Sequence, residues 1–362
     1  MKAKKHIARV LLYSLLLVAM MALTAPVVWA QGGGESGEGS NQANQNRSGT
    51  GGAVELLVPL TARYTALGSS TTSGLADMNG LEALYANPAG LVSMTGTSVI
   101  FSRMEYVADI GVNYFGVGQS FGNNNLAFTI AAWDFGDIPK QTETAPEISD
   151  VTFDVSFITA GLSYARQLTD RIAVGTTVKL ISESIDDIEA TGVALDAGMT
   201  YVVGESGLRL GVSLKNIGNA LQYSGTGLVR QVQLPGQPGN ATNNAVAIES
   251  AGVELPTLLN FGAAYTRQVG AGATVTVLGN FRSNSFDQDQ YSGGLELGFQ
   301  EIVYLRGGVE LTQDSDLTFF QGYSFGAGLN LNLSGTRLTL DYALVPTDFF
   351  DNVQFITASV TL

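Results

Sequence analysis

The chain alternates apolar and polar residues over fourteen segments of about ten residues each, from about Thr97 to Leu362. Successive side chains of a β-strand point to opposite faces, so this alternation predicts strands with one apolar face and one polar face. Strands of soluble sandwiches run about 5–6 residues, whereas about 9–11 residues match a tilted crossing of a bilayer. The pattern therefore predicts an all-β membrane protein, a 14-stranded antiparallel outer-membrane β-barrel over residues 97–362. A soluble β-protein is the alternative.

The clearest alternation lies between Arg171 and Tyr201. Apolar side chains recur at alternate positions as far as Leu180, and the alternation resumes at Val193. The residues between these two runs are expected to form a loop.

Connections of two lengths join the expected strands. Short polar turns follow the even-numbered strands, at 123–125, 169–170, 204–206, 270–272, 300–301 and 334–335. Longer connections mostly follow the odd-numbered strands, the largest at about 135–153 and 218–255. This asymmetry predicts periplasmic turns at one rim and extracellular loops at the other, with both termini on the periplasmic side. The 218–255 connection is either an external lid or a variable loop.

The first thirty residues have the layout of a secretory signal peptide. Four basic residues precede an apolar core at 10–23, and a small residue, Ala30, ends the segment. This layout predicts a cleaved signal peptide, residues 1–30, and export to the outer membrane of a Gram-negative-type (diderm) bacterium. A retained membrane anchor is the alternative, which the shortness of the apolar run disfavours.

Residues 31–96 separate the signal peptide from the first strand. Residues 31–52 are rich in Gly, Ser and Asn and predict a disordered periplasmic leader, with a peptide-binding tether as the alternative. Residues 53–96, here called the hatch, predict a short helical plug inside the barrel mouth. One helix is expected at 60–67 before Gly68 and another at 80–86, followed by a turn at 87–90.

Composition excludes several kinds of chemistry. The chain has no cysteine, and its one histidine, His6, falls in the expected signal peptide. A serine–histidine triad and the common zinc-hydrolase sites are therefore excluded from the mature chain. Removing residues 1–30 takes away four of the eighteen Lys and Arg and no acid, which leaves a formal net charge of −18. This charge argues against nucleic acid as a partner. We expect a non-enzymatic protein with no cofactor and no metal ion.

Several ordered motifs resemble those of a known family of outer-membrane proteins. They lie at 62–68, 76–77 and 83–91, with further matches at 106–110, 134–138, 162–171 and 208–218. Together they are similar to the PorV/PorQ family and cover about residues 60–218, with the remaining strands matching more loosely. The resemblance implies a hatch motif made of Arg63, Tyr64, Gly68, Asp77, Tyr85, Asn87, Pro88 and Gly90.

The PorV/PorQ family is similar in turn to the FadL fatty-acid transporters, which are 14-stranded barrels with an Asn-Pro-Ala turn in an N-terminal hatch. The resemblance implies a docking or shuttle barrel for protein secretion and surface attachment, as in the type IX secretion system. Secreted cargo proteins, secretion-system components and outer-membrane lipid are then the expected partners. The alternative is a FadL-like passive transporter of small hydrophobic or amphipathic molecules, which binds a lipid-like ligand. The chain ends in Leu362, where outer-membrane strands usually end in an aromatic residue.

Strand phase also predicts which charges face the lumen. The charged side chains on that face are Lys179, Asp196, Arg209, Lys215, Glu296, Arg306, Glu310, Arg337 and Asp341. Folding neighbouring strands about their connections brings Lys179 to Asp196, and Glu296 to Arg306, as cross-strand ion pairs. These pairs are expected to fill and rigidify a plugged lumen, with a polar conduit as the alternative. Few inward positions are large and apolar, which argues against a fatty-acid tunnel.

The expected strand ends and external loops carry two further groups of residues. Aromatic side chains there predict an interfacial girdle, with an exposed docking patch at the extracellular rim as the alternative; they are Tyr106, Phe121, Phe135, Phe299, Phe319, Phe349 and Phe350. Phe349 and Phe350 are adjacent in the last external loop and form a candidate partner-docking rim, because two adjacent residues of a strand cannot both face lipid. Acidic clusters at 186–189, 287–289 and 314–316 are interpreted as solvated loop charge, with calcium bridging as the alternative.

Overall fold

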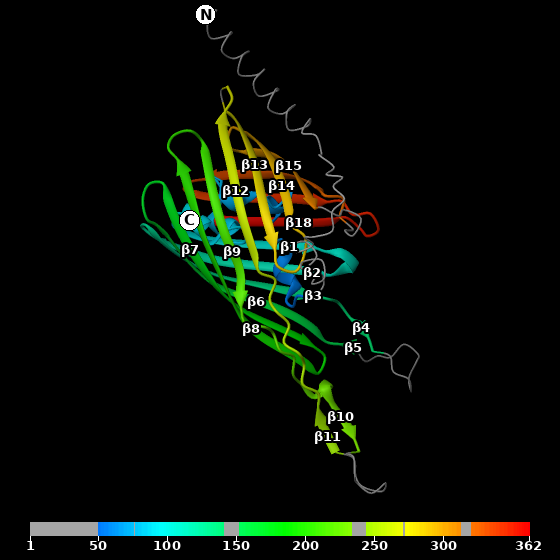
Figure 1. Ribbon diagram of the computed structural model, residues 1–362. Coiled ribbons are helices and arrows are strands. Elements are labelled where there is room, and N and C mark those ends of the chain that lie inside the picture. Colours follow the sequence, from blue (N-terminus) through cyan, green and yellow to red (C-terminus); the bar gives the residue numbers. More distant parts are fainter. Residues whose placement is uncertain (1–49, 76, 141–151, 234–243, 271, 313–319) are drawn as a thin grey trace, which may run out of the picture. The chain divides into compact units, whose positions relative to one another are not determined.

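Fourteen antiparallel strands form one closed barrel (Figure 1), which confirms the architecture predicted from the alternation. The computed structural model describes residues 50–75, 77–140, 152–233, 244–270, 272–312 and 320–362. The expected signal peptide, nearly all of the expected leader, Phe319 and the acidic cluster at 314–316 lie outside these residues.

Each barrel strand pairs with its two neighbours, and the first strand pairs with the last to close the sheet. The barrel strands are β1 (Thr97–Glu105), β2 (Gly111–Phe121), β3 (Asn124–Asp134), β6 (Val155–Gln167), β7 (Ile172–Ile185), β8 (Ile188–Val203), β9 (Leu208–Gly218), β12 (Leu258–Gln268), β13 (Ala273–Asn284), β14 (Gln290–Phe299), β15 (Val303–Thr312), β16 (Tyr323–Leu333), β17 (Thr336–Val345) and β18 (Val353–Thr361).

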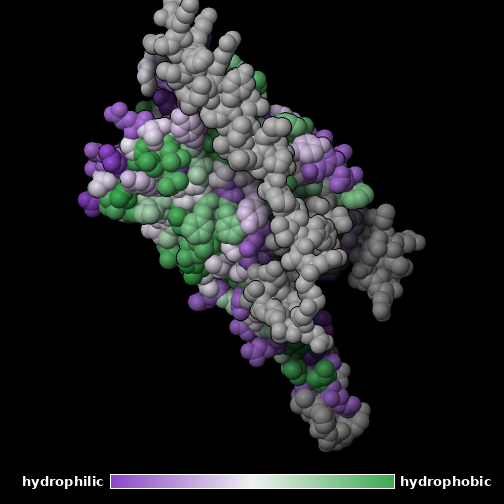
Figure 2. Space-filling model, turned by 45° about the horizontal axis from the view of Figure 1, so that its top comes forward, coloured by the Kyte–Doolittle hydropathy of each residue, from purple (hydrophilic) through white to green (hydrophobic). Residues whose placement is uncertain are grey.

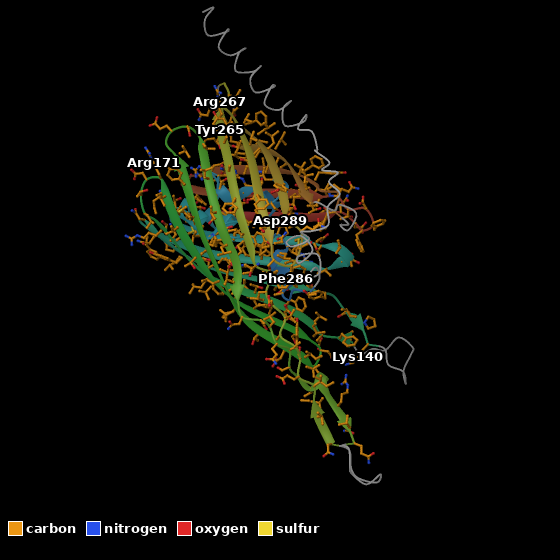
Figure 3. The ribbon with its side chains drawn as sticks, in the orientation of Figure 1. Lys140, Arg171, Tyr265, Arg267, Phe286 and Asp289 are labelled. Carbon is orange, nitrogen blue, oxygen red and sulfur yellow. The ribbon has the colours of Figure 1, made fainter. Side chains whose placement is uncertain are left out.

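The two ends of the barrel differ in their connections. The end with the six predicted short turns is called the turn rim, and the opposite end, with the long connections, is called the loop rim. Figure 3 shows Arg171 and Arg267 at the turn rim, and Phe286, Asp289 and Lys140 toward the other end. A short helical turn, η4 (Val107–Asp109), joins β1 to β2 at the loop rim.

The expected loop between Leu180 and Val193 is instead part of a long hairpin. β7 and β8 continue to a tight turn at 186–187, so Glu189 of the acidic cluster lies within β8. The strands extend because their inward side chains find partners at the loop rim. Ile181 and Ala190 are buried in one apolar cluster with Leu56 of the hatch.

Two long connections carry small sheets of their own. The 218–255 connection contains a helical turn, η5 (Thr226–Leu228), and a hairpin of β10 (Val229–Val232) and β11 (Asn244–Ala247). Leu221 pairs with Val253 across the base of this connection, and Ser224 pairs with Glu189 of β8, so the base is fixed to the barrel. The connection after β3 contains β4 (Ile138–Pro139) paired with β5 (Thr152–Phe153).

The outer wall of the barrel is apolar. Large exposed side chains recur on the outward positions, and Figure 2 shows green residues gathered over the outer face of the strands. Phe121 and Phe299 are exposed at the turn rim, where an interfacial girdle is expected. Tyr106 is different, because its ring packs against Trp133 and Phe320 and not toward lipid. The interpretation of Tyr106 as a girdle residue was wrong.

The hatch occupies the lumen from one rim to the other. Its elements are η1 (Val54–Leu57), α3 (Ala62–Ala66), η2 (Thr71–Ser73), α4 (Gly80–Ala83) and η3 (Pro88–Ser93). Helix α3 packs against the apolar side chains of Met104, Val112 and Phe355 on the wall. Within the described part of the chain, no helix has the length and apolar character that crossing a membrane requires.

The hatch begins at the loop rim. The amide of Gly52 donates to the carbonyl of Glu254 at that rim, whereas the amide of Thr97, just after the hatch, donates to Leu362 at the turn rim. Both termini were expected on the turn side. Leu362 does lie at the turn rim, and the N-terminal end lies outside the described residues. The described part of the chain begins at the loop rim, where Ala53 and Leu56 are buried in the apolar cluster.

Inward-facing glycines give the hatch room against the wall. A Cβ on Gly308 would lie 2.0 Å from the backbone nitrogen of Gly68, where the chain leaves α3 with a φ of 60°. A Cβ on Gly307, the next residue along β15, would meet nothing closer than 4.0 Å. Close packing of the hatch therefore depends on the inward glycine and not on its outward neighbour.

This difference predicts opposite outcomes for two neighbouring substitutions. Gly308→Leu is expected to displace the hatch, because Leu cannot occupy the position of the Gly68 backbone. Gly307→Leu is expected to leave the hatch in place. Limited proteolysis of the folded barrel would measure this as faster cleavage in the hatch of Gly308→Leu alone. Equal protection of the two variants would contradict the packing described here.

Candidate functional site

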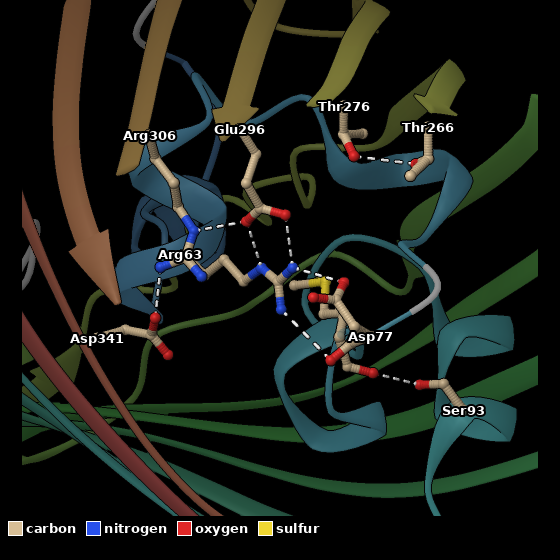
Figure 4. A network of polar contacts seen from close by, with 9 residues as sticks. Arg63, Asp77, Ser93, Thr266, Thr276, Glu296, Arg306 and Asp341 are labelled. Atoms are coloured by element: carbon tan, nitrogen blue, oxygen red, sulfur yellow. Dashed lines mark hydrogen bonds and ion pairs between the residues drawn. The ribbon is translucent and has the colours of Figure 1, made fainter. Parts of the chain in front are cut away.

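Arg63 of α3 binds two carboxylates, one on the barrel wall and one in the hatch (Figure 4). Its Nε lies 3.0 Å and its Nη2 2.8 Å from the two carboxylate oxygens of Glu296 on β14, a bidentate pair. The same Nη2 lies 2.8 Å from Oδ1 of Asp77, also in the hatch. Planar guanidinium groups suit this geometry, because their donors match the spacing of a carboxylate.

Arg306 of β15 extends the network along the wall. Its Nε lies 2.6 Å from Oε2 of Glu296, and its Nη1 donates to Oδ1 of Asp341 on β17. The Tyr304 ring centre lies 5.5 Å from the Arg63 guanidinium and 5.4 Å from that of Arg306, within the range of cation–π attraction. The hatch and three wall strands thus share one network.

The centre of the network is shielded from water, whereas the side chain of Asp77 at its edge is 38% exposed. The side chains of Arg63 and Glu296 are 5% and 4% exposed, so their charges are stable only as partners. Burial opposes the charge of Arg63, but Asp77 and Glu296 outweigh burial and hold the pKa of Arg63 above its usual range. Burial likewise opposes ionisation of Asp77, but Arg63 lowers the pKa of Asp77 to about 2.

Glu82 of α4 adds a carboxyl group that stays protonated at neutral pH. Burial, and then the negative charge of Asp341, raises the pKa of Glu82 to about 8. Its Oε1 is buried and has no hydrogen-bond partner in the structure. A neutral Glu82 avoids a further negative charge beside Asp341 and Glu296.

The turn at 87–90 anchors the hatch on the other side of the lumen. Oδ1 of Asn87 accepts from the amide of Ala89 at 3.0 Å, an N-cap of η3. Nδ2 of Asn87 donates to the carbonyls of Thr72, Met199 and Val212 at 2.9, 3.1 and 3.2 Å. One side chain therefore joins two parts of the hatch to β8 and β9.

The other residues of the motif complete this turn. Pro88 begins η3, where a missing amide hydrogen costs nothing, and Gly90 lies against the methyl group of Ala83. Gly198 of β8 faces the turn, and a Cβ there would lie 1.9 Å from Oδ1 of Asn87.

Two hatch tyrosines carry polar contacts across the lumen. The hydroxyl of Tyr64 accepts from Nη2 of Arg282 on β13 at 2.7 Å, and its ring lies edge-on to Tyr85, with centres 5.1 Å apart. The hydroxyl of Tyr85 donates to the carbonyl of Leu56 at 3.1 Å. Nζ of Lys215 lies 3.7 Å above the Tyr85 ring. Every residue of the predicted hatch motif thus contacts another hatch segment or the wall.

A cavity of about 350 Å³ lies between the hatch and the loop-rim ends of β13–β18. Its apolar lining includes Leu57, Val58, Pro59, Tyr106, Phe320, Val345, Val353 and Phe355, and its polar lining includes Thr65, Arg282, Gln290, Glu310 and Thr312. Few large apolar lumen residues were expected from strand phase. Much of the apolar lining comes from the hatch and from residues outside the strands, which strand phase does not describe.

Of the predicted lumen charges, some form ion pairs, one lies in the cavity wall, and two arginines are more exposed. Nζ of Lys179 lies 2.6 Å from Oδ2 of Asp196, although the register places Ala194 opposite Lys179. Glu296 and Arg306 are directly opposite and paired. Glu310 accepts from Gln290 at 2.9 Å in the cavity wall. Arg209 is half-buried, and Arg337 is exposed beside the β16–β17 turn.

Sequence reasoning missed four polar residues of the lumen. Arg282 donates to Asn260, Gln290 and Tyr64, and Glu82, Glu55 and Glu183 are buried acids. Strand phase could have found Glu183, which shares its face with Lys179, but a loop was expected at that position. Nothing in the spacing of Glu55 or Glu82 signals burial, because the hatch helices are too short to show a period.

The candidate docking residues lie in the connection between β17 and β18. Phe349 is 86% exposed and Phe350 is also exposed. The acidic residues at 186–187 and 287–289 lie at the loop rim, and within the described residues no group of three or more His, Asp or Glu could hold a metal ion.

Solved structures share this barrel, although sequence comparison finds no relative. No sequence model of a protein family matches the chain, and no curated protein matches it. The P. putida toluene transporter TodX superposes with a TM-score of 0.51 at 12% identity, over 83% of this chain and 97% of that one. The monoaromatic hydrocarbon channel CymD gives 0.51 at 13% identity, over 84% and 97%. A Pseudomonas aeruginosa FadL homologue gives 0.50 at 10%, over 84% and 98%.

The chain has the FadL-type barrel fold. At these identities the likeness shows the fold alone, and the apolar outer wall agrees with the outer-membrane setting of that fold. The FadL-like part of the family resemblance is thereby supported, whereas membership of the PorV/PorQ family stays a prediction.

Replacing Arg63 is expected to lower the stability of the FadL-type barrel strongly. Arg63→Met is expected to lower the free energy of unfolding by about 3 kcal/mol, because it removes one of the two cationic partners of buried Glu296 and leaves Asp77 without its ion pair. Arg337→Met, at an exposed position of the turn rim, is expected to change it by less than about 0.5 kcal/mol. Urea unfolding in lipid vesicles measures both. Equal stability of the two variants would show that Arg63 does not hold the hatch.

The raised pKa of Glu82 is expected to make the stability of the fold depend on pH. Its carboxyl ionises near 4.5 in the unfolded chain and near 8 in the folded one, so between these values the folded state binds more protons. The free energy of unfolding therefore falls as pH rises from about 4.5 to 8. Glu82→Gln is expected to reduce this slope, which unfolding midpoints at pH 5, 6.5 and 8 in EDTA would measure. An unchanged slope would mean that Glu82 is already ionised in the folded protein.

Proposed function

We propose that this protein is a passive outer-membrane channel for small hydrophobic or amphipathic molecules, which enter through the cavity at the loop rim. The proposal rests on this cavity, because it has an apolar wall and a short polar edge inside a membrane barrel. Its volume of about 350 Å³ lies at the low end of the range for ligand pockets, so the ligand is small.

The distribution of side chains suits an amphipathic ligand. Val345, Val353 and Phe355 provide one apolar side, and Val58 and Pro59 of the hatch provide another. The polar edge consists of Arg282, Gln290 and Glu310 on β13–β15. A ligand would bury its apolar part against the first group and place a hydroxyl, amine or carbonyl group at the second.

The hatch accounts for selectivity. A barrel of fourteen strands would otherwise enclose a wide aqueous channel, but the Arg63 network and the Asn87 turn join the hatch to opposite sides of the wall. A solute can therefore pass only if the hatch moves or if a path opens along its side. Within the described residues, neither is present for bulk solutes. The solved relatives named as toluene or monoaromatic hydrocarbon channels support this class of ligand.

Filling the cavity tests the proposal. Thr312 lines the cavity at the end of β15, and its neighbour Leu311 is 63% exposed on the outer wall. Thr312→Phe is expected to weaken binding of iodobenzene by roughly tenfold, because the added ring occupies ligand space. Leu311→Phe adds a ring of the same size outside the barrel and is expected to have no effect.

Trp133 provides the measurement, since the only other tryptophan, Trp29, falls in the expected signal peptide. Trp133 contacts Tyr106 of the cavity wall, so bound iodobenzene is expected to quench its fluorescence in a saturable way. Quenching that does not saturate, or that is equally weakened in both variants, would overturn the proposal.

A docking role in protein secretion is the second candidate. The exposed pair Phe349 and Phe350 at the loop rim supports it, because adjacent exposed aromatics suit partner contact. The iodobenzene experiment separates the two candidates. A barrel that serves only as a docking surface has no need to bind a small apolar ligand in its cavity.

A further inference from the structure

Three polar side chains from three separate segments meet at the loop rim, away from the Arg63 network. Glu55 belongs to η1 at the start of the hatch, and Glu183 points inward from the end of β7. Tyr223 belongs to the 218–255 connection, and its hydroxyl donates to Oε2 of Glu183. The group thus joins the hatch, the barrel and the longest external connection.

The two carboxylates are buried, and three of their four oxygens have no hydrogen-bond partner. Glu55 is 6% exposed and Glu183 is 2% exposed. Both carboxylate oxygens of Glu55, and Oε1 of Glu183, have no hydrogen-bond partner in the structure. Apolar side chains surround the pair, including Leu56, Ile181 and Leu221. Unpaired carboxylate oxygens in such a setting carry a large desolvation cost.

Among the residues that the structure describes, no basic side chain forms an ion pair with Glu55 or Glu183. The nearest inward lysine on β7, Lys179, pairs with Asp196. Burial, and then the charge of Glu183, raises the pKa of Glu55 to about 8. Two neighbouring carboxyl groups in an apolar surrounding require either a shared proton or a cation between them.

We propose that Glu55 and Glu183 bind a hard divalent cation, with Ca²⁺ as the fitting ion, and that this cation clamps the start of the hatch to the loop rim. Ca²⁺ prefers carboxylate oxygens and accepts water for its remaining ligands. The three oxygens without partners supply the protein ligands, and Tyr223 orients Glu183 by its hydrogen bond to Oε2. Water molecules that enter with the ion would complete the coordination.

The clamp would act on the cavity as well as on the hatch. Residues 57–59, which line the cavity, follow Glu55 directly in the chain. Fixing Glu55 therefore fixes one apolar side of the cavity. Two carboxylates make a site of modest strength, in keeping with the dissociation constants of about 10⁻⁴–10⁻³ M of extracellular calcium modules.

Terbium luminescence and thermal unfolding test the site in the purified full-length barrel. Tb³⁺ binds calcium sites and emits when a nearby tyrosine is excited, and Tyr223 contacts Glu183 directly. We expect saturable Tb³⁺ emission that Ca²⁺ competes away, and a rise of several degrees in the unfolding midpoint on adding millimolar Ca²⁺. Tyr223→Phe is expected to lose most of the emission and to keep the Ca²⁺ shift.

Glu55→Gln and Glu183→Gln are each expected to abolish both responses. Glu249→Gln provides the matched control, because Glu249 is an exposed acid of the same 218–255 connection. It is expected to retain both. A wild-type protein with no Ca²⁺ shift and no competed emission would establish a shared proton in place of the cation. Retention of both responses in Glu55→Gln would place the ion elsewhere, and either result overturns the proposal.

Discussion

The bidentate ion pair between Arg63 of the hatch and Glu296 of the wall is the interaction on which the rest of the structure depends. A barrel with a polar lumen can fill with water or with protein, and the hatch fills much of this one. Side chains buried between hatch and wall lie in a medium of low polarity, where each charge requires a partner in close contact. Arg63, Arg306, Asp77 and Asp341 supply those partners around Glu296, and Glu82 remains neutral beside them. The charges of the wall therefore specify where α3 of the hatch must lie.

The rest of the lumen is arranged around that position. Gly308 allows the chain after α3 to approach β15 closely, and Gly198 allows the Asn87 turn to approach β8. The hatch is thus held on two sides of the lumen, and the space left between it and the loop rim is the ligand cavity. The contacts that hold the hatch in the lumen therefore also determine the shape of the cavity.

Sequence reasoning predicted the barrel well because strand alternation, turn length and register are linked. The tight turn at 300–301 determines which residues of β14 and β15 face each other, so the Glu296–Arg306 pair followed from the sequence. The partners of Arg63 did not follow, because the hatch has no strand period and its position depends on contacts distant in sequence. For the same reason, Glu55 and Glu82 were not predicted. Glu183 was not predicted because a loop was expected where the β7–β8 hairpin continues. The hatch begins at the loop rim with the burial of Ala53 and Leu56, which composition alone does not reveal.

Electrical recording from the purified wild-type barrel in a planar bilayer tests the central claim, that the charge-anchored hatch closes the lumen. We expect no steady ion current at moderate voltage, because the hatch, held by the buried Arg63–Glu296 pair, lies across the lumen. A steady current proportional to voltage in the wild-type protein would show that the lumen is open and would contradict the account.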